Sequence, residues 1–143
     1  MASRPQPTHR IGLHPVHAVL LASTLPLFVG ALLSDLAYRE SYQIQWTNFA
    51  SWLVVGGLLF TGLSLFWAVV DLVRAGGRLQ RSALLYPLLV LATFLAGFVN
   101  ALIHAKDAWA TMPGAVIFSI IVALLAMAAV WAGFSISRAG DMR

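Results

Sequence analysis

Long apolar stretches dominate the chain and predict four helices that cross a membrane. They cover roughly residues 17–37, 48–72, 83–104 and 114–136. Each holds about 20 residues or more, which is enough for a helix to cross a hydrocarbon core of about 30 Å. The connections are short, so successive helices should be antiparallel neighbours. The pattern therefore predicts an all-α polytopic membrane protein, folded as an antiparallel four-helix transmembrane bundle.

These stretches use almost all of the 143 residues. We expect one four-helix transmembrane domain over residues 14–137, between cytoplasmic tails at 1–13 and 138–143. Composition points the same way, since 60% of residues are hydrophobic and only 10% are charged. Soluble domains carry about 25% charged residues. The chain has too few polar groups to cover a water-facing surface, and no soluble catalytic architecture is expected.

Basic residues predict the orientation. Two of the nine, Arg39 and Lys106, fall in the first and third connections. The other seven lie in the two tails or around the second connection: Arg4, Arg10, Arg74, Arg78, Arg81, Arg138 and Arg143. Basic residues gather on the cytoplasmic side of membrane proteins, so both termini should be cytoplasmic, in a bacterial inner membrane. We interpret the net charge of +4 as this topology signal and not as a nucleic-acid surface.

One face of the first expected helix carries two histidines at one end and a carboxylate at the other. Its residues, spaced three and four apart, are His14, His17, Leu21, Thr24, Phe28, Ala31 and Asp35. That spacing puts them on one stripe of a helix. Ionisable groups inside a membrane are costly and usually face a bundle interior or a water-filled cavity. Any chemistry should be sought on this stripe.

The other three expected helices carry stripes of small residues, which let membrane helices approach closely. We expect these faces to pack together: Gly57, Thr61, Ser64, Ala68 and Asp71; Ala92, Ala96, Asn100 and His104; Ser119, Ala123, Ala126, Val130 and Gly133.

Two polar clusters follow from these faces. The predicted inner cluster contains His14, His17 and Asp71, and the predicted outer cluster contains Asp35, Asn100, His104 and Asp107. From His17 to Asp35 is 35 − 17 = 18 residues, or about 27 Å along a helix. The two clusters should therefore lie at opposite ends of the bundle, with Asp35 within side-chain reach of His104.

The chain resembles the DUF2231 family of predicted bacterial membrane proteins. The resemblance covers nearly the whole chain and rests on L-H-P at 13–15, S-D-L-A-Y at 34–38, W-T-N-F-A-S-W-L-V-V-G-G-L at 46–58, Asp71 and N-A-L-I-H-A-K-D-A-W at 100–109. It implies a membrane fold and no known activity. The residues on the family's motif positions are His14, Asp35, Asp71, Asn100, His104, Asp107 and Trp109. Related sequences often carry a histidine near the start of the third helix, where this chain has Arg81 to Tyr86.

The sequence is compatible with four functional interpretations. Haem b would need histidines at one depth on facing helices, whereas His17 and His104 should lie about 27 Å apart. A divalent metal could use His14, His17 or His104 as ligands, together with nearby carboxylates. A proton or ion path could begin and end at the two clusters, although the middle offers only hydroxyl side chains. The chain has no cysteine, which excludes thiolate sites and c-type haem attachment.

The fourth interpretation is that both clusters are hydrogen-bonded networks that lock the helix ends together, with no bound cofactor. The protein would then be a small membrane subunit or anchor and not an enzyme. Its partners would be the lipid bilayer and a membrane or periplasmic protein, or further copies of itself. The sequence carries no phosphate loop, no dinucleotide-binding signature and no Ser/His/Asp set with catalytic spacing.

Overall fold

The computed structural model describes residues 14–74 and 81–141, with side chains at 14–74 and 84–135. The expected tail at 1–13 and the basic residues Arg4, Arg10, Arg78 and Arg143 lie outside the described residues. The described part of the chain is helical, with short connections: α1 (Pro15–Ser41), α2 (Ile44–Arg74), α3 (Arg81–His104), α4 (Ala108–Thr111) and α5 (Gly114–Asp141).

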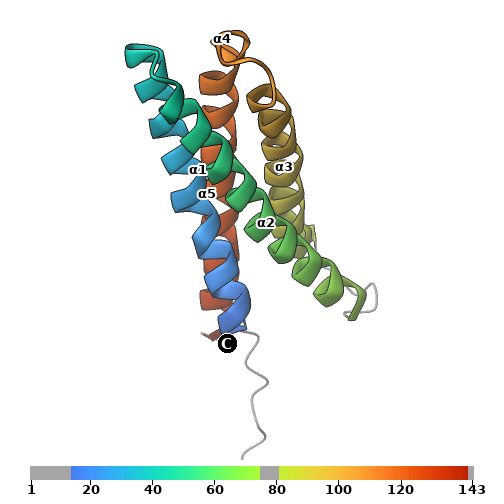
Figure 1. Ribbon diagram of the computed structural model, residues 1–143. Helices are drawn as coiled ribbons and strands as arrows, with labels where there is room; N and C mark the ends of the chain where they lie inside the picture. The colour runs from blue at the N-terminus through green and yellow to red at the C-terminus, as the bar shows by residue number, and fades with distance from the viewer. Residues whose placement is uncertain (1–13, 75–80, 142–143) are drawn as a thin grey trace, which may run out of the picture.

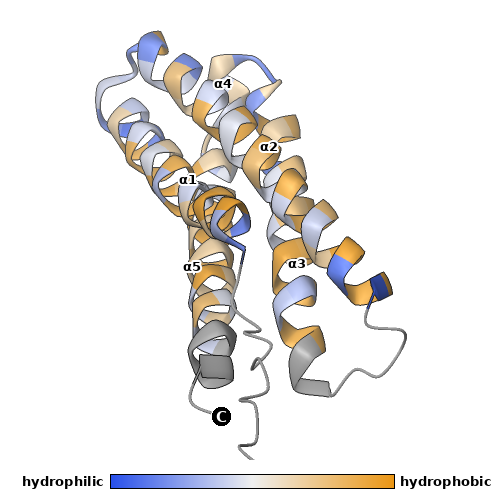
Figure 2. Cartoon of the chain, turned by 90° about the horizontal axis from the view of Figure 1, so that it is seen from below, coloured by the Kyte–Doolittle hydropathy of each residue, from blue (hydrophilic) through white to orange (hydrophobic). Residues whose placement is uncertain are grey.

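Four of these helices are long and apolar enough to cross a membrane: α1, α2, α3 and α5. This confirms the predicted all-α bundle with four membrane-length helices. Hydrophobic colour covers the middle of the helices, and polar colour gathers in the connection between α1 and α2 and near the last turn of α2 (Figure 2). Large apolar side chains such as Trp52, Phe66 and Trp131 are more than two-thirds exposed, as expected where helices contact lipid.

The helix ends have local causes in the sequence. α1 begins where His14 caps it, with Nδ1 accepting a hydrogen bond from the Val16 amide at 3.3 Å, and Pro15 fills the first turn. It ends at Tyr42, whose backbone is left-handed (φ 53°) and whose amide donates to the Tyr38 carbonyl. α4, a single turn between α3 and α5 that the apolar pattern did not predict, begins after Asp107.

The long helices form a four-membered ring. α1 packs mainly on α2 and α5, and α3 packs mainly on the same two helices, so α1 and α3 are diagonal partners across the bundle (Figure 1). We call the end with the α1–α2 connection and α4 the outer end, and the end where α1 begins the inner end. The two names follow the predicted orientation.

A large side chain fills the middle of the ring because two glycines make room for it. The ring of Phe28, 1% exposed, packs against Val122 and Ala126 of α5. A Cβ on Gly57 of α2 would lie 2.6 Å from Phe28, and one on Gly97 of α3 would lie 3.3 Å from it. Phe28 is therefore the central packing residue of the bundle, and it separates the two ends.

Candidate functional site

Two side-chain contacts join the diagonal helices α1 and α3, one at each end. His17 contacts Tyr86 at the inner end, and Asp35 contacts His104 at the outer end. Both pairs are 69 positions apart in the sequence. Phe28 and Gly97, which meet in the middle, have the same separation (97 − 28 = 69). The buried stripe of α1 therefore faces the buried face of α3 in a constant register over their whole length.

The outer contact is part of a network that joins three helices. Asp35 of α1 has one carboxylate oxygen, Oδ1, 2.8 Å from Nε2 of His104 on α3. Its other oxygen, Oδ2, accepts a hydrogen bond of 2.5 Å from the hydroxyl of Ser119 on α5. Ser119 in turn accepts one of 2.9 Å from the side-chain amide of Asn100 on α3. We call Asp35, Asn100, His104 and Ser119 the outer network.

The outer network is closed to solvent. The side chains of Asp35 and His104 are 0% and 2% exposed, and Asn100 and Ser119 are also buried. His104 is held from its other side as well, because Nδ1 donates to the Asn100 carbonyl at 2.9 Å. The remaining polar atom, Oδ1 of Asn100, is buried without a hydrogen-bond partner in the described part of the chain. Such a network fixes the rotation of three helices together.

The expected contact between Asp35 and His104 is thus present, and Asn100 joins it. Asp107 does not, because it is exposed and makes no side-chain hydrogen bond at the start of α4. Trp109 is 79% exposed and stacks on Tyr42, with ring centroids 5.5 Å apart. Ser119 belongs to the outer network, although the sequence pattern indicated only a small packing residue at that position.

The inner contact is aromatic. His17, 2% exposed, has Nε2 2.6 Å from the hydroxyl of Tyr86 on α3. Trp67 of α2 packs beside both histidines, with ring centroids 5.1 Å from His14 and 5.7 Å from His17. We call His14, His17, Trp67 and Tyr86 the inner aromatic group.

The predicted inner cluster of His14, His17 and Asp71 is not a hydrogen-bonded group in the structure. His14 and Asp71 are both exposed, and no side-chain hydrogen bond joins Asp71 to either histidine within the described segments. Asp71 is exposed because it lies beyond Ala68, the last buried residue of α2. No group of three or more histidines and carboxylates there is close enough to hold a metal ion, as far as the described residues extend.

Three buried threonine hydroxyls of the bundle bond to their own helices, whereas the buried Ser64 hydroxyl has no hydrogen-bond partner in the described part of the chain. Thr24 donates to the Leu21 carbonyl, Thr61 to Gly57 and Thr93 to Leu89, each at 2.7 Å. These local bonds satisfy the threonine donors without a partner on another helix. The hydroxyls therefore do not form a chain between the inner aromatic group and the outer network.

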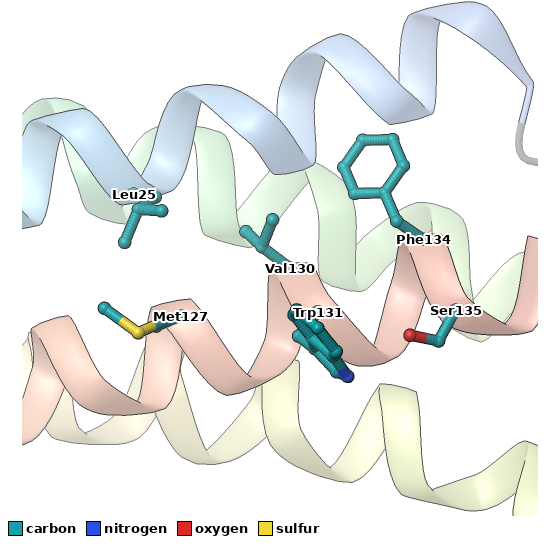
Figure 3. Close-up of a pocket in the computed structure, with 6 residues that line it drawn as sticks. All are labelled: Leu25, Met127, Val130, Trp131, Phe134 and Ser135. Atoms are coloured by element: carbon teal, nitrogen blue, oxygen red, sulfur yellow. The ribbon is translucent and has the colours of Figure 1, made fainter.

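A shallow apolar groove runs along the membrane-facing side of α1 and α5. Its volume is about 260 Å³, and it is lined by Leu25 of α1 and by Met127, Val130, Trp131, Phe134 and Ser135 of α5 (Figure 3). All but Ser135 are apolar, which suits the acyl chains of lipid. The groove is separate from the buried polar groups at both ends.

A family comparison agrees with this fold. The family model described as "Predicted membrane protein (DUF2231)" matches residues 13–140. The chain belongs to this family, as its sequence motifs indicated, and is a multi-pass membrane protein that contacts the lipid bilayer. Neither the curated proteins nor the solved structures gave a match to the chain.

Proposed function

We propose that this protein is a non-catalytic membrane subunit, which anchors or supports a partner protein at the membrane. The main support for the proposal is that Asp35 makes its contacts inside the bundle. Both of its oxygens bond to other helices of the same chain, at full burial. A buried carboxylate engaged in this way stabilises the relative positions of helices, and removing one partner of such a pair costs about 3–5 kcal/mol.

The histidines support a structural role over a haem role. Both ring nitrogens of His104 are in hydrogen bonds. His17 has Nε2 on the Tyr86 hydroxyl, and its Nδ1 is buried without a hydrogen-bond partner in the described part of the chain. Iron needs a free imidazole nitrogen, and bis-histidine ligation needs two at one depth. His17 and His104 instead lie at opposite ends of the bundle, on either side of Phe28.

The packing in the middle of the bundle favours a structural role over a path for protons or ions. Phe28 fills the ring between the two polar ends, and the threonines near it bond to their own backbone. A path would need polar groups or water to pass this layer.

We further propose a location in the bacterial inner membrane, with both termini in the cytoplasm. The support is the asymmetry of basic residues, seven against two. The large exposed apolar side chains then face lipid or the helices of a partner, and the outer end with α4 faces the periplasm.

A native gel of membranes extracted in mild detergent tests the subunit proposal. The chain should migrate in an assembly larger than the purified 15.4 kDa protein in the same detergent. Migration of all the protein at the size of the purified chain would contradict the proposal.

In a second assay, vesicles containing the purified protein and a pH-sensitive dye should leak protons no faster than empty vesicles. A faster leak would favour the transport interpretation.

A further inference from the structure

The hydrogen-bond pattern of His104 determines where its ring hydrogens lie. A backbone carbonyl only accepts hydrogen bonds, so the 2.9 Å contact with the Asn100 carbonyl requires a hydrogen on Nδ1. In a neutral imidazole with that hydrogen, Nε2 carries a lone pair. Nε2 faces the Asp35 carboxylate at 2.8 Å, and an ionised carboxylate also only accepts. Two acceptors at that distance repel each other unless a hydrogen lies between them.

The other oxygen of Asp35 shows that this hydrogen belongs at the histidine contact. The Asn100 amide donates to the Ser119 hydroxyl, and that hydroxyl donates to Asp35 Oδ2. Oδ2 is therefore an acceptor with its own donor. The added hydrogen must lie between Oδ1 and Nε2, on whichever of the two atoms carries it.

Charge leads to the same result independently. With the added hydrogen, Asp35 and His104 together carry no net charge. Without it they carry one negative charge, in side chains that are 0% and 2% exposed. An uncompensated charge at such burial is very unfavourable.

Few other nearby groups could neutralise the negative charge of Asp35 or exchange a proton with the pair. On α1, Tyr38 is buried one turn away, and the exposed Arg39 pairs with Glu40 at 3.0 Å. Thr47 and Ala50 are the buried residues near the start of α2, Ser119 of α5 donates to Asp35, and Lys106 and Asp107 after α3 are exposed. Among the described side chains, His104 is the one basic group that forms an ion pair with Asp35.

We propose that the outer network is a proton-binding site, in which Asp35 and His104 hold one proton between Oδ1 and Nε2 and that proton ties α1 to α3. This inference does not rest on the proposed subunit role. Loss of the proton leaves a lone pair facing a buried carboxylate, and the outer ends of the two helices lose their diagonal contact.

The site makes stability depend on pH with a definite sign. Above about pH 6.5 a solvated histidine is mainly neutral and a solvated aspartate is ionised. The folded chain then holds one proton more than the unfolded chain, so folding weakens as the pH rises. The unfolding equilibrium constant should increase about tenfold per pH unit, until the folded pair also loses its proton.

The variant Asp35→Asn removes the titrating proton but can keep the hydrogen bonds of the outer network. An asparagine amide can donate to the lone pair of Nε2 while its carbonyl oxygen accepts from Ser119, so the contacts persist without a titrating proton. Asp107→Asn is the matched control, because it removes an exposed carboxylate that makes no side-chain hydrogen bond.

The experiment compares thermal unfolding of the full chain in detergent between roughly pH 7 and pH 10, the range in which a free histidine is mainly neutral and most carboxylates are ionised. The unmodified protein and Asp107→Asn should lose stability in parallel as the pH rises, and Asp35→Asn should lose most of that dependence. An Asp35→Asn slope equal to that of the unmodified protein would overturn the proposal, as would an unmodified protein with no slope.

A second measurement keeps the test decisive if Asp35→Asn does not fold. In the unmodified protein with ¹⁵N-labelled histidine at about pH 8, where a free histidine is mainly neutral, the NMR signal of His104 Nε2 should report a hydrogen-bonded proton, either carried by Nε2 or donated to it by Asp35. A His104 Nε2 signal typical of a bare lone pair at that pH would overturn the proposal.

Discussion

Replacing Gly57 with alanine perturbs the packing around the central residue of the bundle. The added Cβ would lie 2.6 Å from Cε1 and 2.7 Å from Cζ of Phe28, well inside van der Waals contact. The ring has little room to move, because it is 1% exposed and also contacts Val122, Ala126 and the Gly97 position. Overpacking of this kind costs about 1–3 kcal/mol. Alanine also gains about 1 kcal/mol of helix propensity over glycine, which offsets part of that cost.

The neighbouring Gly56 provides a matched control. A Cβ there would lie 3.6 Å from the nearest atoms, the two methyl carbons of Leu27, which is ordinary contact. Gly56→Ala gains the same helix propensity without the overlap, so the difference between the two variants isolates the packing cost at about 1–3 kcal/mol. Thermal unfolding in one detergent measures both. Equal stability of the two variants would refute the assignment of the Gly57 face to the bundle centre.

Three other changes test the remaining contacts. Tyr86→Phe removes the hydroxyl that bonds to His17 Nε2 and should destabilise the chain by about 1 kcal/mol, measured by thermal unfolding; no loss would mean that this hydrogen bond is not formed. Gly133→Ala places a Cβ 2.6 Å from Leu21 and 3.0 Å from Tyr86, so it should destabilise the chain more than Gly114→Ala, whose nearest atom is at 3.6 Å. A reporter fused after Arg143 should be active when it is of a cytoplasmic type, and activity of only a periplasmic reporter would contradict the predicted orientation.

The first helix illustrates what the sequence could predict. Its stripe mixes ionisable, hydroxyl and large apolar residues at spacings of three and four, and His17 through Asp35 on that stripe are buried as expected. Polar side chains are the informative positions in a membrane helix, because they are costly against lipid. His17 and Asp35, eighteen residues apart, were enough to predict which face of α1 is buried. The four apolar stretches were enough to predict the number of membrane-crossing helices.

The third helix illustrates what the sequence could not predict. The proposed stripe took steps of four from Ala92, but the buried positions of α3 are Tyr86, Val90, Thr93, Gly97 and Asn100, while Ala92 and Ala96 are only half-buried. Steps of four drift by about 40° each around a helix with 3.6 residues per turn, so the stripe follows the core face over only part of its length. Asn100 and the His104 side chain are buried, and Ala92 and Ala96 lie beside that face. Apolar residues face both lipid and core, which removes the contrast that marks a buried face in soluble proteins.

The contact between Asp35 and His104 was predicted, but two other polar partners, Tyr86 and Ser119, could not be predicted from the sequence. Tyr86 pairs with His17 and Ser119 with Asp35 because the helices have particular depths and rotations. A tyrosine or serine in an apolar run carries no signal of which helix it will face. The inner site was therefore predicted with Asp71, which is near in depth but lies on the exposed part of α2.

A double-mutant cycle between Asp35 and His104 tests most directly whether the outer network locks α1 to α3. Asp35→Ala, His104→Ala and the double variant are compared by unfolding in detergent, with Asp107→Ala and His104→Ala as a control cycle. Residues in one hydrogen-bonded network should couple by about 0.5–3 kcal/mol, and the control pair should couple by less than about 0.5 kcal/mol. Additive effects of Asp35→Ala and His104→Ala, with no more coupling than the control, would contradict a structural role for this contact.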